Sequence, residues 1–302
     1  MIMRMEKFVE EVLKGVTEKA GDTFNASITE NLKNNGVKRK AIIMMSPENK
    51  VGSSIYLEEL YAEYKNGGRG IDAIAGEVYQ KLVEHMNDLE DVRLGDFQKW
   101  DVMKHRIYAK LVNFESNKEL LKGKPYRKFL DLAVVYLARV EGLKDGGKGA
   151  FLVNDNYREV WRQTEESLYQ TAASNMRLVG EAVFESMEEI LCQKMPKIQF
   201  PSPASAPAQM YVLTNKEKIF GAAEILDSGT LKRVSDELRG DFIVLPSSVH
   251  ECIIIPADET ISYQKLADMV TEINVNAVSA EECLSDHVYL YERGEGVLKI
   301  AA

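Results

Sequence analysis

The stretch Phe242-Ile-Val-Leu-Pro-Ser-Ser-Val-His-Glu-Cys-Ile-Ile-Ile-Pro256 decides the fold class of this chain. It holds two short, mainly apolar runs, at residues 242–245 and 251–255, on either side of a turn at residues 246–249. Short runs rich in β-branched residues are typical of strands, and Pro and Ser are typical of the turn between them. The stretch therefore predicts a β-hairpin of two antiparallel strands.

The sequence on both sides of this hairpin predicts further strands and helices. Upstream lie a strand at residues 210–213 and a helical segment at residues 219–238, which is broken at Ser228-Gly229. Downstream lie a helix that Ser262 caps and a second hairpin within residues 287–300. Because hairpins rather than helical crossovers join the strands, the order indicates an α+β fold with mixed or antiparallel sheets and helices packed on one face.

The N-terminal two thirds of the chain predict the same mixture of helices and strands. Apolar residues recur with helical spacing in some segments, and β-branched and aromatic residues are enriched in others. Thr164 followed by Glu165 and Glu166 is typical of a helix N-terminus. The predicted helices are residues 4–20, 57–64, 71–87 and 157–192, and the predicted strands are residues 24–29, 40–45, 106–112, 128–140 and 150–153.

A proline-rich stretch predicts the domain boundary. Three of the eight prolines fall within Pro201-Ser-Pro-Ala-Ser-Ala-Pro207, with only small side chains between them. Proline fixes φ and disfavours helix in the residue before it, so this stretch favours an extended linker. We expect an N-terminal α+β domain at residues 1–198, a linker at residues 199–208 and a C-terminal α+β domain at residues 209–302.

Composition and charge indicate a cytoplasmic protein. The N-terminus mixes charged residues into every turn and lacks the apolar segment of a signal peptide, and no stretch is long and apolar enough to span a membrane. The three cysteines, Cys192, Cys252 and Cys283, form no CxxC pair, which suits a reducing compartment, and each is expected to be a small buried residue.

Nucleic-acid binding is a secondary hypothesis, because the net charge of −9 disfavours it. The stretch Lys122-Gly-Lys-Pro-Tyr-Arg-Lys128 places four basic side chains around one aromatic ring, which could contact phosphates and stack on a base. An exposed loop kept soluble by its lysines explains the same stretch. The glycine-rich residues 142–149 resemble a phosphate loop but lack its final Ser or Thr, and we interpret them as a turn.

Two pairs of His and carboxylate residues are the candidate catalytic groups. His250-Glu251 begins one predicted strand, and Asp286-His287 begins another. If these strands were neighbours, the four side chains could form a zinc or iron site or an acid–base pair. The chain has no helical metal-binding spacing, and half-exposed hydrogen-bonding histidines explain the same pattern, so we assign no metal and no cofactor.

Polar residues at the ends of two strands are the candidate binding groups. Thr214 and Asn215 follow the strand at residues 210–213, and Ser247 and Ser248 follow the strand at residues 242–245. Loops at strand ends often carry function. The alternative is that these side chains cap a helix or hydrogen-bond the backbone of a turn.

Several short blocks resemble an uncharacterised bacterial family known only as domain of unknown function 5688, found mostly in anaerobic gut bacteria. The blocks span most of the chain, from about residue 24 to residue 293. The resemblance implies a cytoplasmic bacterial protein and gives no activity, cofactor or catalytic residue. The blocks are Ile55-Tyr-Leu-Glu-Glu-Leu-Tyr61, Phe129-Leu-Asp-Leu-Ala133, Tyr211-Val-Leu-Thr-Asn215, Leu245-Pro-Ser-Ser-Val-His-Glu251 and Leu284-Ser-Asp-His-Val-Tyr289.

These observations favour a non-enzymatic binding or regulatory protein. No complete catalytic motif occurs in the 302 residues, whereas polar turn residues gather in the C-terminal part. We expect residues 214–221 and 246–251 to recognise an unknown protein or small-molecule ligand, without a membrane. The alternatives are a hydrolase or metal-dependent enzyme that uses the His and carboxylate pairs, and nucleic-acid binding through the basic middle segment.

Overall fold

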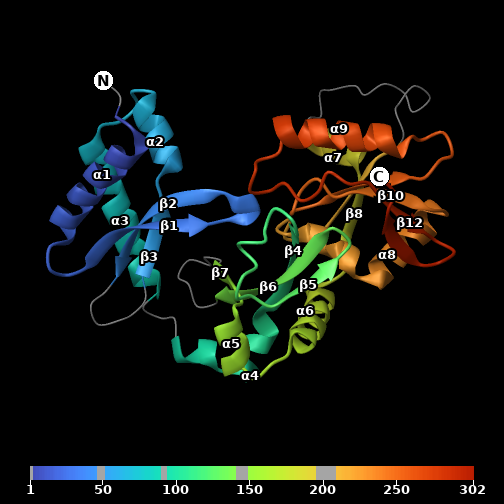
Figure 1. Ribbon diagram of the computed structural model, residues 1–302, viewed down its shortest axis with the longest axis horizontal. Coiled ribbons are helices and arrows are strands. Elements are labelled where there is room, and N and C mark those ends of the chain that lie inside the picture. The colour runs from blue at the N-terminus through green and yellow to red at the C-terminus, as the bar shows by residue number, and fades with distance from the viewer. Residues whose placement is uncertain (1–2, 46–51, 90–93, 141–148, 195–208) are drawn as a thin grey trace. The chain divides into compact units, whose positions relative to one another are not determined.

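The computed structural model describes residues 3–45, 52–89, 94–140, 149–194 and 209–302 (Figure 1). The chain divides into two compact units. Unit 1 consists of Met1–Phe97 with Arg139–Ala150, and unit 2 consists of Gln98–Ala138 with Phe151–Ala302. The predicted linker at residues 199–208 lies wholly outside the described residues, so the predicted boundary stays a prediction. No described helix is long and apolar enough to cross a membrane.

Unit 1 is a three-stranded antiparallel sheet with helices on one face. The sheet has the order β1 (Asn25–Leu32), β2 (Lys38–Met45), β3 (Gly52–Tyr56), with the 3₁₀ turn η1 (Asn34–Gly36) between the first two strands. The helices are α1 (Met5–Ala20), α2 (Glu58–Lys65) and α3 (Ile71–Leu89), as the apolar spacing predicted. Phe8, Val12 and Val16 recur every four residues along α1 and are buried with residues of α3 and β2 in one core.

The second sheet has four antiparallel strands, and two of them replace the single strand predicted over residues 128–140. Its strands are β4 (Ile107–Asn113), β5 (Tyr126–Phe129), β6 (Leu132–Val140) and β7 (Gly149–Leu152). The order is β4-β6-β5, and β7 also pairs with β6. The prediction of one strand over residues 128–140 is wrong, because Leu130-Asp131 forms a two-residue turn and Phe129 pairs with Leu132. Leu130 adopts φ +55°, a conformation for which Gly or Asn is the usual signal.

The segment predicted as helix over residues 157–192 contains three helices and one strand. The helices are α5 (Asp155–Val160), α6 (Glu165–Val179) and α7 (Met187–Lys194). Thr164 caps α6, as predicted, by accepting a hydrogen bond from the backbone N–H of Ser167. Gly180 ends α6 at φ +121°, and β8 (Val183–Ser186) follows. The uninterrupted helix was wrong because β8 becomes a strand by pairing with β9, a long-range contact.

The short helices that precede β4 are η2 (Leu94–Gln98), α4 (Trp100–Met103) and η3 (Lys104–Arg106). The longer helix α6 packs on β4. On α6, Leu168, Ala172 and Asn175 are buried at a spacing of four and three residues, so they share one face of the helix. The Asn175 amide donates hydrogen bonds to the backbone oxygens of Lys104 and Ile107, at 2.7 and 2.8 Å.

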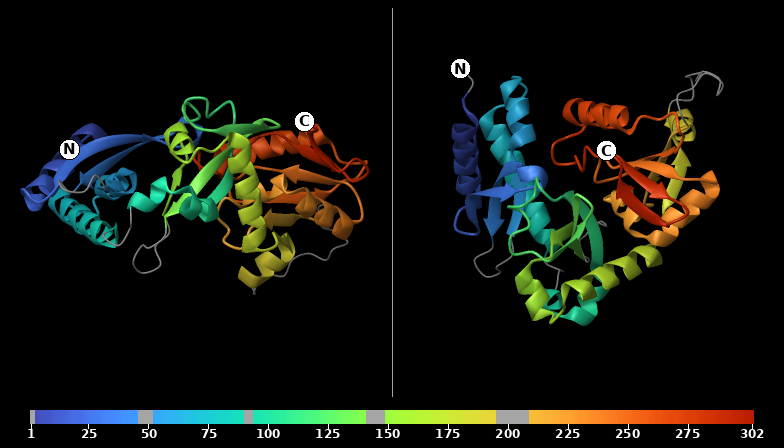
Figure 2. Two further views of the ribbon diagram at one scale, coloured as in Figure 1. Left: turned by 90° about the horizontal axis from the view of Figure 1, so that it is seen from below. Right: turned by 45° about the vertical axis from the view of Figure 1, so that its right-hand side comes forward.

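The largest sheet has six strands in the order β13-β12-β10-β11-β9-β8. Figure 1 labels β8, β10 and β12 of this sheet, and Figure 2 shows the orange and red C-terminal part of the chain from two further sides. The predicted hairpin of β10 and β11 is confirmed, with Leu245 opposite Ile253. The second hairpin, β12 and β13, is confirmed as well. The strands are β9 (Tyr211–Thr214), β10 (Phe242–Leu245), β11 (Cys252–Pro256), β12 (Tyr289–Glu292) and β13 (Val297–Ile300), and the helices are η6 (Gly221–Leu226), α8 (Ser228–Leu238) and α9 (Tyr263–Asn276).

Both faces of β10 are buried. Ile243 and Leu245 pack with Val270 of α9 on one face. On β11, Cys252 points to the other face, where its sulfur lies 4.0 Å from the backbone oxygen of Ala222 in η6. Cys252 is thus buried as expected, whereas Cys192 is exposed and corrects the prediction that every cysteine is buried. The α+β class is confirmed, with three antiparallel sheets in the described residues.

Candidate functional site: a cavity around Glu224

The predicted binding residues of β9 hydrogen-bond the protein itself. The Thr214 hydroxyl donates to the backbone oxygen of His250 at 2.8 Å. The Asn215 side chain closes the next turn, since its amide donates to the Ile219 backbone oxygen at 2.9 Å and its oxygen accepts from the Ile219 N–H at 3.3 Å. These contacts match the turn-forming alternative, and a binding role for Thr214 and Asn215 stays a prediction.

Ser247 and Ser248 also lie in a hydrogen-bonded turn. The backbone oxygen of Ser247 accepts a bond from the Leu284 N–H at 3.0 Å. The Ser248 hydroxyl accepts a bond from the N–H of His250 at 3.1 Å, which organises the turn before β11. A ligand-binding role for either serine stays a prediction.

The two His and carboxylate pairs begin strands that are not neighbours. β10 lies between β11, which follows His250 and Glu251, and β12, which follows Asp286 and His287. The catalytic hypothesis requires these two strands to be neighbours, and the sheet order shows that they are not. Among the residues that the structure describes, no three His, Cys, Asp or Glu side chains are placed to hold a metal ion.

Each of these groups has a local environment of its own. His250 accepts a hydrogen bond from the Phe220 N–H at 3.2 Å and stacks on the Phe220 ring. Asp286 accepts a bond from the Asn274 amide at 2.7 Å, while Glu251 is exposed. Nδ1 of His287 lies 3.0 Å from the backbone oxygen of Ala302. A catalytic role for His250, Glu251, Asp286 and His287 stays a prediction.

Three cations of the basic stretch at residues 122–128 contact the protein. The Lys124 ammonium donates to the backbone oxygen of Leu120 at 2.6 Å, and the Lys128 ammonium lies 3.8 Å from the centre of the Phe114 ring. Arg127 forms ion pairs with Glu165 and Glu166. These contacts give the stretch a structural role, and the phosphate-loop resemblance at residues 142–149 lies almost wholly outside the described residues.

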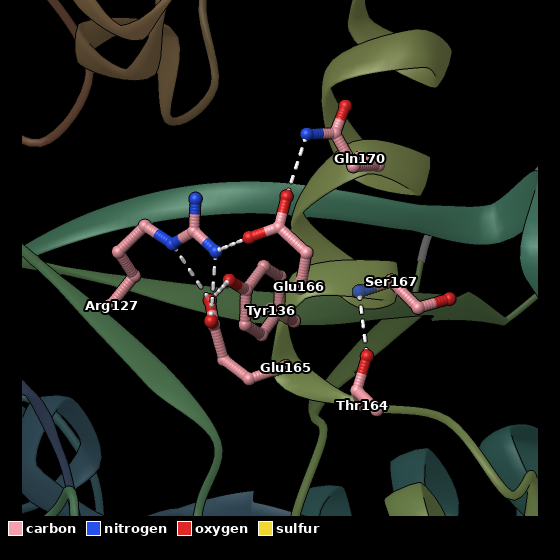
Figure 3. Close-up of polar contacts among 7 residues, drawn as sticks. All are labelled: Arg127, Tyr136, Thr164, Glu165, Glu166, Ser167 and Gln170. Carbon is pink, nitrogen blue, oxygen red and sulfur yellow. Dashed lines mark hydrogen bonds and ion pairs between the residues drawn. The ribbon is translucent and has the colours of Figure 1, made fainter.

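Arg127 holds the first turn of α6 in place (Figure 3). Its guanidinium donates to both oxygens of Glu165, at 2.9 and 3.2 Å, and also to Glu166. The Tyr136 hydroxyl donates to Glu165 as well, and burial raises the pKa of Tyr136. Arg127 further lies 4.1 Å from the centre of the Tyr169 ring, one turn along the helix. The start of α6 is therefore fixed to β5 and β6.

The face of α6 that carries Tyr169 lines a cavity of about 430 Å³. Lining residues on the helix follow a spacing of four and three, which places them on one side of α6. Arg127 packs on Tyr169, and Gln170 donates a hydrogen bond to Glu166 at 2.7 Å, so the network of Figure 3 reaches the cavity. The residues of α6 that line it are Tyr169, Gln170, Ala173, Met176 and Arg177.

The opposite part of the lining comes from η6 and the start of α8, and it contains a buried acid. Glu224 is 7% exposed. Within the described ranges, no group donates a hydrogen bond to its carboxylate. The pKa of Glu224 is raised to about 7, chiefly by burial and also by the negative charge of Asp227, while Arg233 acts in the opposite direction. A carboxyl group that changes charge near neutral pH therefore lies in the cavity wall.

The other charged groups around Glu224 have protein partners. Asp227 caps α8, since its Oδ2 accepts a hydrogen bond from the Thr230 N–H at 2.8 Å. Its Oδ1 lies 2.9 Å from a guanidinium nitrogen of Arg177. Arg233 donates to the backbone oxygen of Ala182 at 2.7 Å. Glu224 differs from these three in having an acceptor group that the described protein does not use.

Glu224 was missed because its segment predicts an ordinary helix. The signal was present, since Glu224 is the one charged residue within Ile219-Phe-Gly-Ala-Ala-Glu-Ile-Leu226. A single carboxylate inside such an apolar run indicates either that the segment is exposed at that residue or that the carboxylate is buried. The structure shows the buried acid, because residues 221–225 of η6 are all buried.

Unit 1 contains a second contact between reactive groups. The Ser53 hydroxyl on β3 lies 3.1 Å from Nδ1 of His85 on α3. Nucleophilic catalysis by such a pair needs a third group that orients the imidazole. His85 has no further hydrogen-bond partner among the described residues, so this pair is less complete as a site than the cavity around Glu224.

The family of the chain follows from comparison with known proteins. The chain matches no curated protein and no solved structure. The model of a family of unknown function, DUF5688, matches residues 5–293, which confirms the resemblance seen in the short sequence blocks. Because this match covers nearly the whole chain, the protein belongs to the family of unknown function DUF5688.

Proposed function

We propose that this protein binds a small molecule in the cavity around Glu224. One observation carries the proposal: a carboxylate that is 7% exposed, and that no described group hydrogen-bonds, lines a cavity of about 430 Å³. Its carboxylate oxygens can therefore accept hydrogen bonds from a molecule in the cavity. A hydrogen bond to a charged group typically contributes about 1.5–3 kcal/mol.

The size and construction of the cavity support ligand binding. Small-molecule sites typically enclose about 300–1,000 Å³ and combine apolar walls with a few polar groups. Here Ala173 and Met176 supply apolar surface, and Glu224 supplies the polar group. The wall is also held rigidly, because α6 is fixed at its start by Arg127 and packs on β4.

This proposal narrows the sequence-based hypothesis of a non-enzymatic binding or regulatory protein. The proposed site lies next to residues 214–221, one of the two turns expected to recognise a ligand, and it favours a small molecule over a protein. The absence of a CxxC pair from the sequence suits a reducing compartment and supports a cytoplasmic protein, which is part of the same proposal. A bacterial source is proposed from the family resemblance alone.

A cavity-filling variant tests the proposal. Fragments that bind the wild-type protein are identified by ligand-observed NMR and retested on Ala173→Trp, which places an indole in the cavity. Ser174→Trp is the matched control, because Ser174 is exposed on the same helix and does not line the cavity. We expect the fragments to bind wild type and Ser174→Trp but not Ala173→Trp. Equal binding to Ala173→Trp, or no fragment binding at all, would contradict the proposal.

A further inference from the structure

We infer that the ligand of this cavity carries a positively charged nitrogen, such as an ammonium or amidinium group, which pairs with Glu224. This inference rests on the proposed function and names the ligand class. The charges of the cavity wall support it. The lining has three acidic residues, Glu181, Glu224 and Asp227, and two basic residues, Arg177 and Arg233, which leaves one acid in excess.

An anionic ligand is disfavoured at the start of α8, because Asp227 already places a carboxylate there. The N-terminus of α8 borders the cavity, and helix N-termini commonly bind anions through their backbone N–H groups. In this protein the Asp227 carboxylate already accepts the Thr230 N–H at 2.8 Å. The chain therefore supplies its own anion to α8, and a second anion there would be repelled by Asp227.

The two arginines of the wall do not neutralise Glu224 by direct contact. Arg177 lies 2.9 Å from Asp227, and Arg233 donates to the backbone oxygen of Ala182 at 2.7 Å. Arg233 acts on Glu224 through space only, and no ion pair joins the two side chains in the described structure. Neither arginine donates a hydrogen bond to Glu224, so a cationic ligand would bring to the ionised carboxylate both a donor and a compensating charge.

The charge state of Glu224 makes the inference testable by pH. The titratable and charged groups that line the cavity around it are Tyr169 and Arg177 on α6, Glu181 just after α6, Asp227 before α8 and Arg233 within α8, while β4 contributes Ala109. The Lys216 side chain also lies against Gly180 of the wall. Burial holds the pKa of Glu224 at about 7 without ligand. A cation binds the ionised carboxylate, so its affinity rises as pH rises through this value, whereas an anion shows the opposite trend.

Three probes of similar size separate the charge classes: benzylamine as the cation, benzyl alcohol as the neutral molecule and benzoate as the anion. Their affinities for the full chain are measured at about pH 8 and about pH 5.5 by the chemical shift of the Met176 methyl group, which lines the cavity. We expect benzylamine to bind about tenfold or more tightly than benzyl alcohol at the higher pH, as for a charge-assisted hydrogen bond. At the lower pH this preference should fall about tenfold.

Two variants complete the test. Glu224→Gln keeps the shape of the side chain and should abolish the preference for benzylamine, whereas Glu237→Gln removes an exposed carboxylate of α8 that does not line the cavity and should retain it. Equal affinity for benzylamine and benzyl alcohol, or tighter binding of benzoate, overturns the inference while leaving a ligand-binding cavity. If no probe shifts Met176 and no library fragment depends on Ala173, the inference and the proposed function fail together.

Discussion

The guanidinium of Arg177 lies 2.9 Å from Oδ1 of Asp227. The ion pair joins α6 to the residue before α8. Arg177 lies on the same face of α6 as Tyr169, and its guanidinium is already paired with a carboxylate. Glu224, three residues before Asp227, consequently stays buried without a direct cationic partner. Because Arg177 pairs with Asp227 and not with Glu224, we propose that Glu224 pairs with a cationic ligand.

Glu224 should make the stability of the protein depend on pH. Its pKa is raised from 4.5 to about 7 in the folded protein, so the folded state holds this proton more tightly than the unfolded chain does. The resulting stabilisation is present below pH 4.5 and is lost as pH rises through about 7. Glu224→Gln should therefore gain stability relative to wild type by about 2–3 kcal/mol more at pH 8 than at pH 5.

Urea unfolding at the two pH values measures this gain. Glu181→Gln, in the same wall but exposed, should show a change within about 0.5 kcal/mol. A stability difference between Glu224→Gln and wild type that is the same at both pH values would show that Glu224 has an ordinary pKa.

Gly221→Ala should be strongly destabilising. A Cβ atom at this position would lie 2.6 Å from the backbone nitrogen of Asn215 and 2.7 Å from the backbone oxygen of His250, and it would also overlap the Thr214 hydroxyl. Because two of these atoms belong to the backbone, relief requires a shift of the strand ends. We expect a loss of about 3 kcal/mol or more in the free energy of unfolding.

Gly240→Ala is the control for this variant, because a Cβ atom there has no neighbour within 4 Å. It should change stability by no more than about 1 kcal/mol. Similar losses for the two variants in chemical denaturation would contradict the close approach of η6 to the ends of β9 and β11.

Arg127 should stabilise the protein through its bidentate pair of hydrogen bonds to Glu165. Arg127→Met removes both hydrogen bonds to Glu165, and we expect a loss of about 1–3 kcal/mol. Arg127→Lys should recover less than half of it, because an ammonium cannot form the same paired geometry. Lys118→Met breaks an exposed pair with Glu115 and should have an effect below about 1 kcal/mol. Full recovery by lysine in thermal unfolding would show that charge alone matters.

Tyr289→Phe should weaken a buried contact between segments far apart in the sequence. The Tyr289 hydroxyl donates to Oδ1 of Asp131, and the Ser285 hydroxyl donates to Oδ2 at 2.7 Å. Removing the first bond leaves Asp131 with one fewer donor, and we expect a loss of about 1–3 kcal/mol. Tyr126→Phe, at an exposed position, is the control. Equal stabilities of the two variants in urea would contradict a structural role for the Tyr289–Asp131 bond.

Local sequence patterns predicted most of the regular elements. The period of Phe8, Val12 and Val16 was sufficient for α1, and the hairpin of β10 and β11 follows from two apolar runs and a turn. The failures have a common physical cause. The turn at Leu130-Asp131 lacks Gly or Asn, and β8 is a strand because β9 pairs with it, so both depend on contacts distant in sequence.

The candidate site was less predictable than the fold. Polar residues at strand ends attracted attention, but Thr214, Asn215 and Ser248 use their side chains to hold turns together. Glu224 is important because α6 and α8 enclose it, and an enclosure made by two distant helices leaves no local pattern. Its apolar surroundings in residues 219–226 were the only available indication.

The pKa of Glu224 is the property on which the proposed cation site depends most. The side-chain carboxyl carbon of Glu224, assigned with the Glu224→Gln variant, is titrated by NMR in the ligand-free protein and again with saturating benzylamine. We predict a pKa of about 7 without ligand, and a lower pKa once the cation occupies the cavity. A ligand-free pKa near 4.5, or one that benzylamine leaves unchanged, would contradict the account.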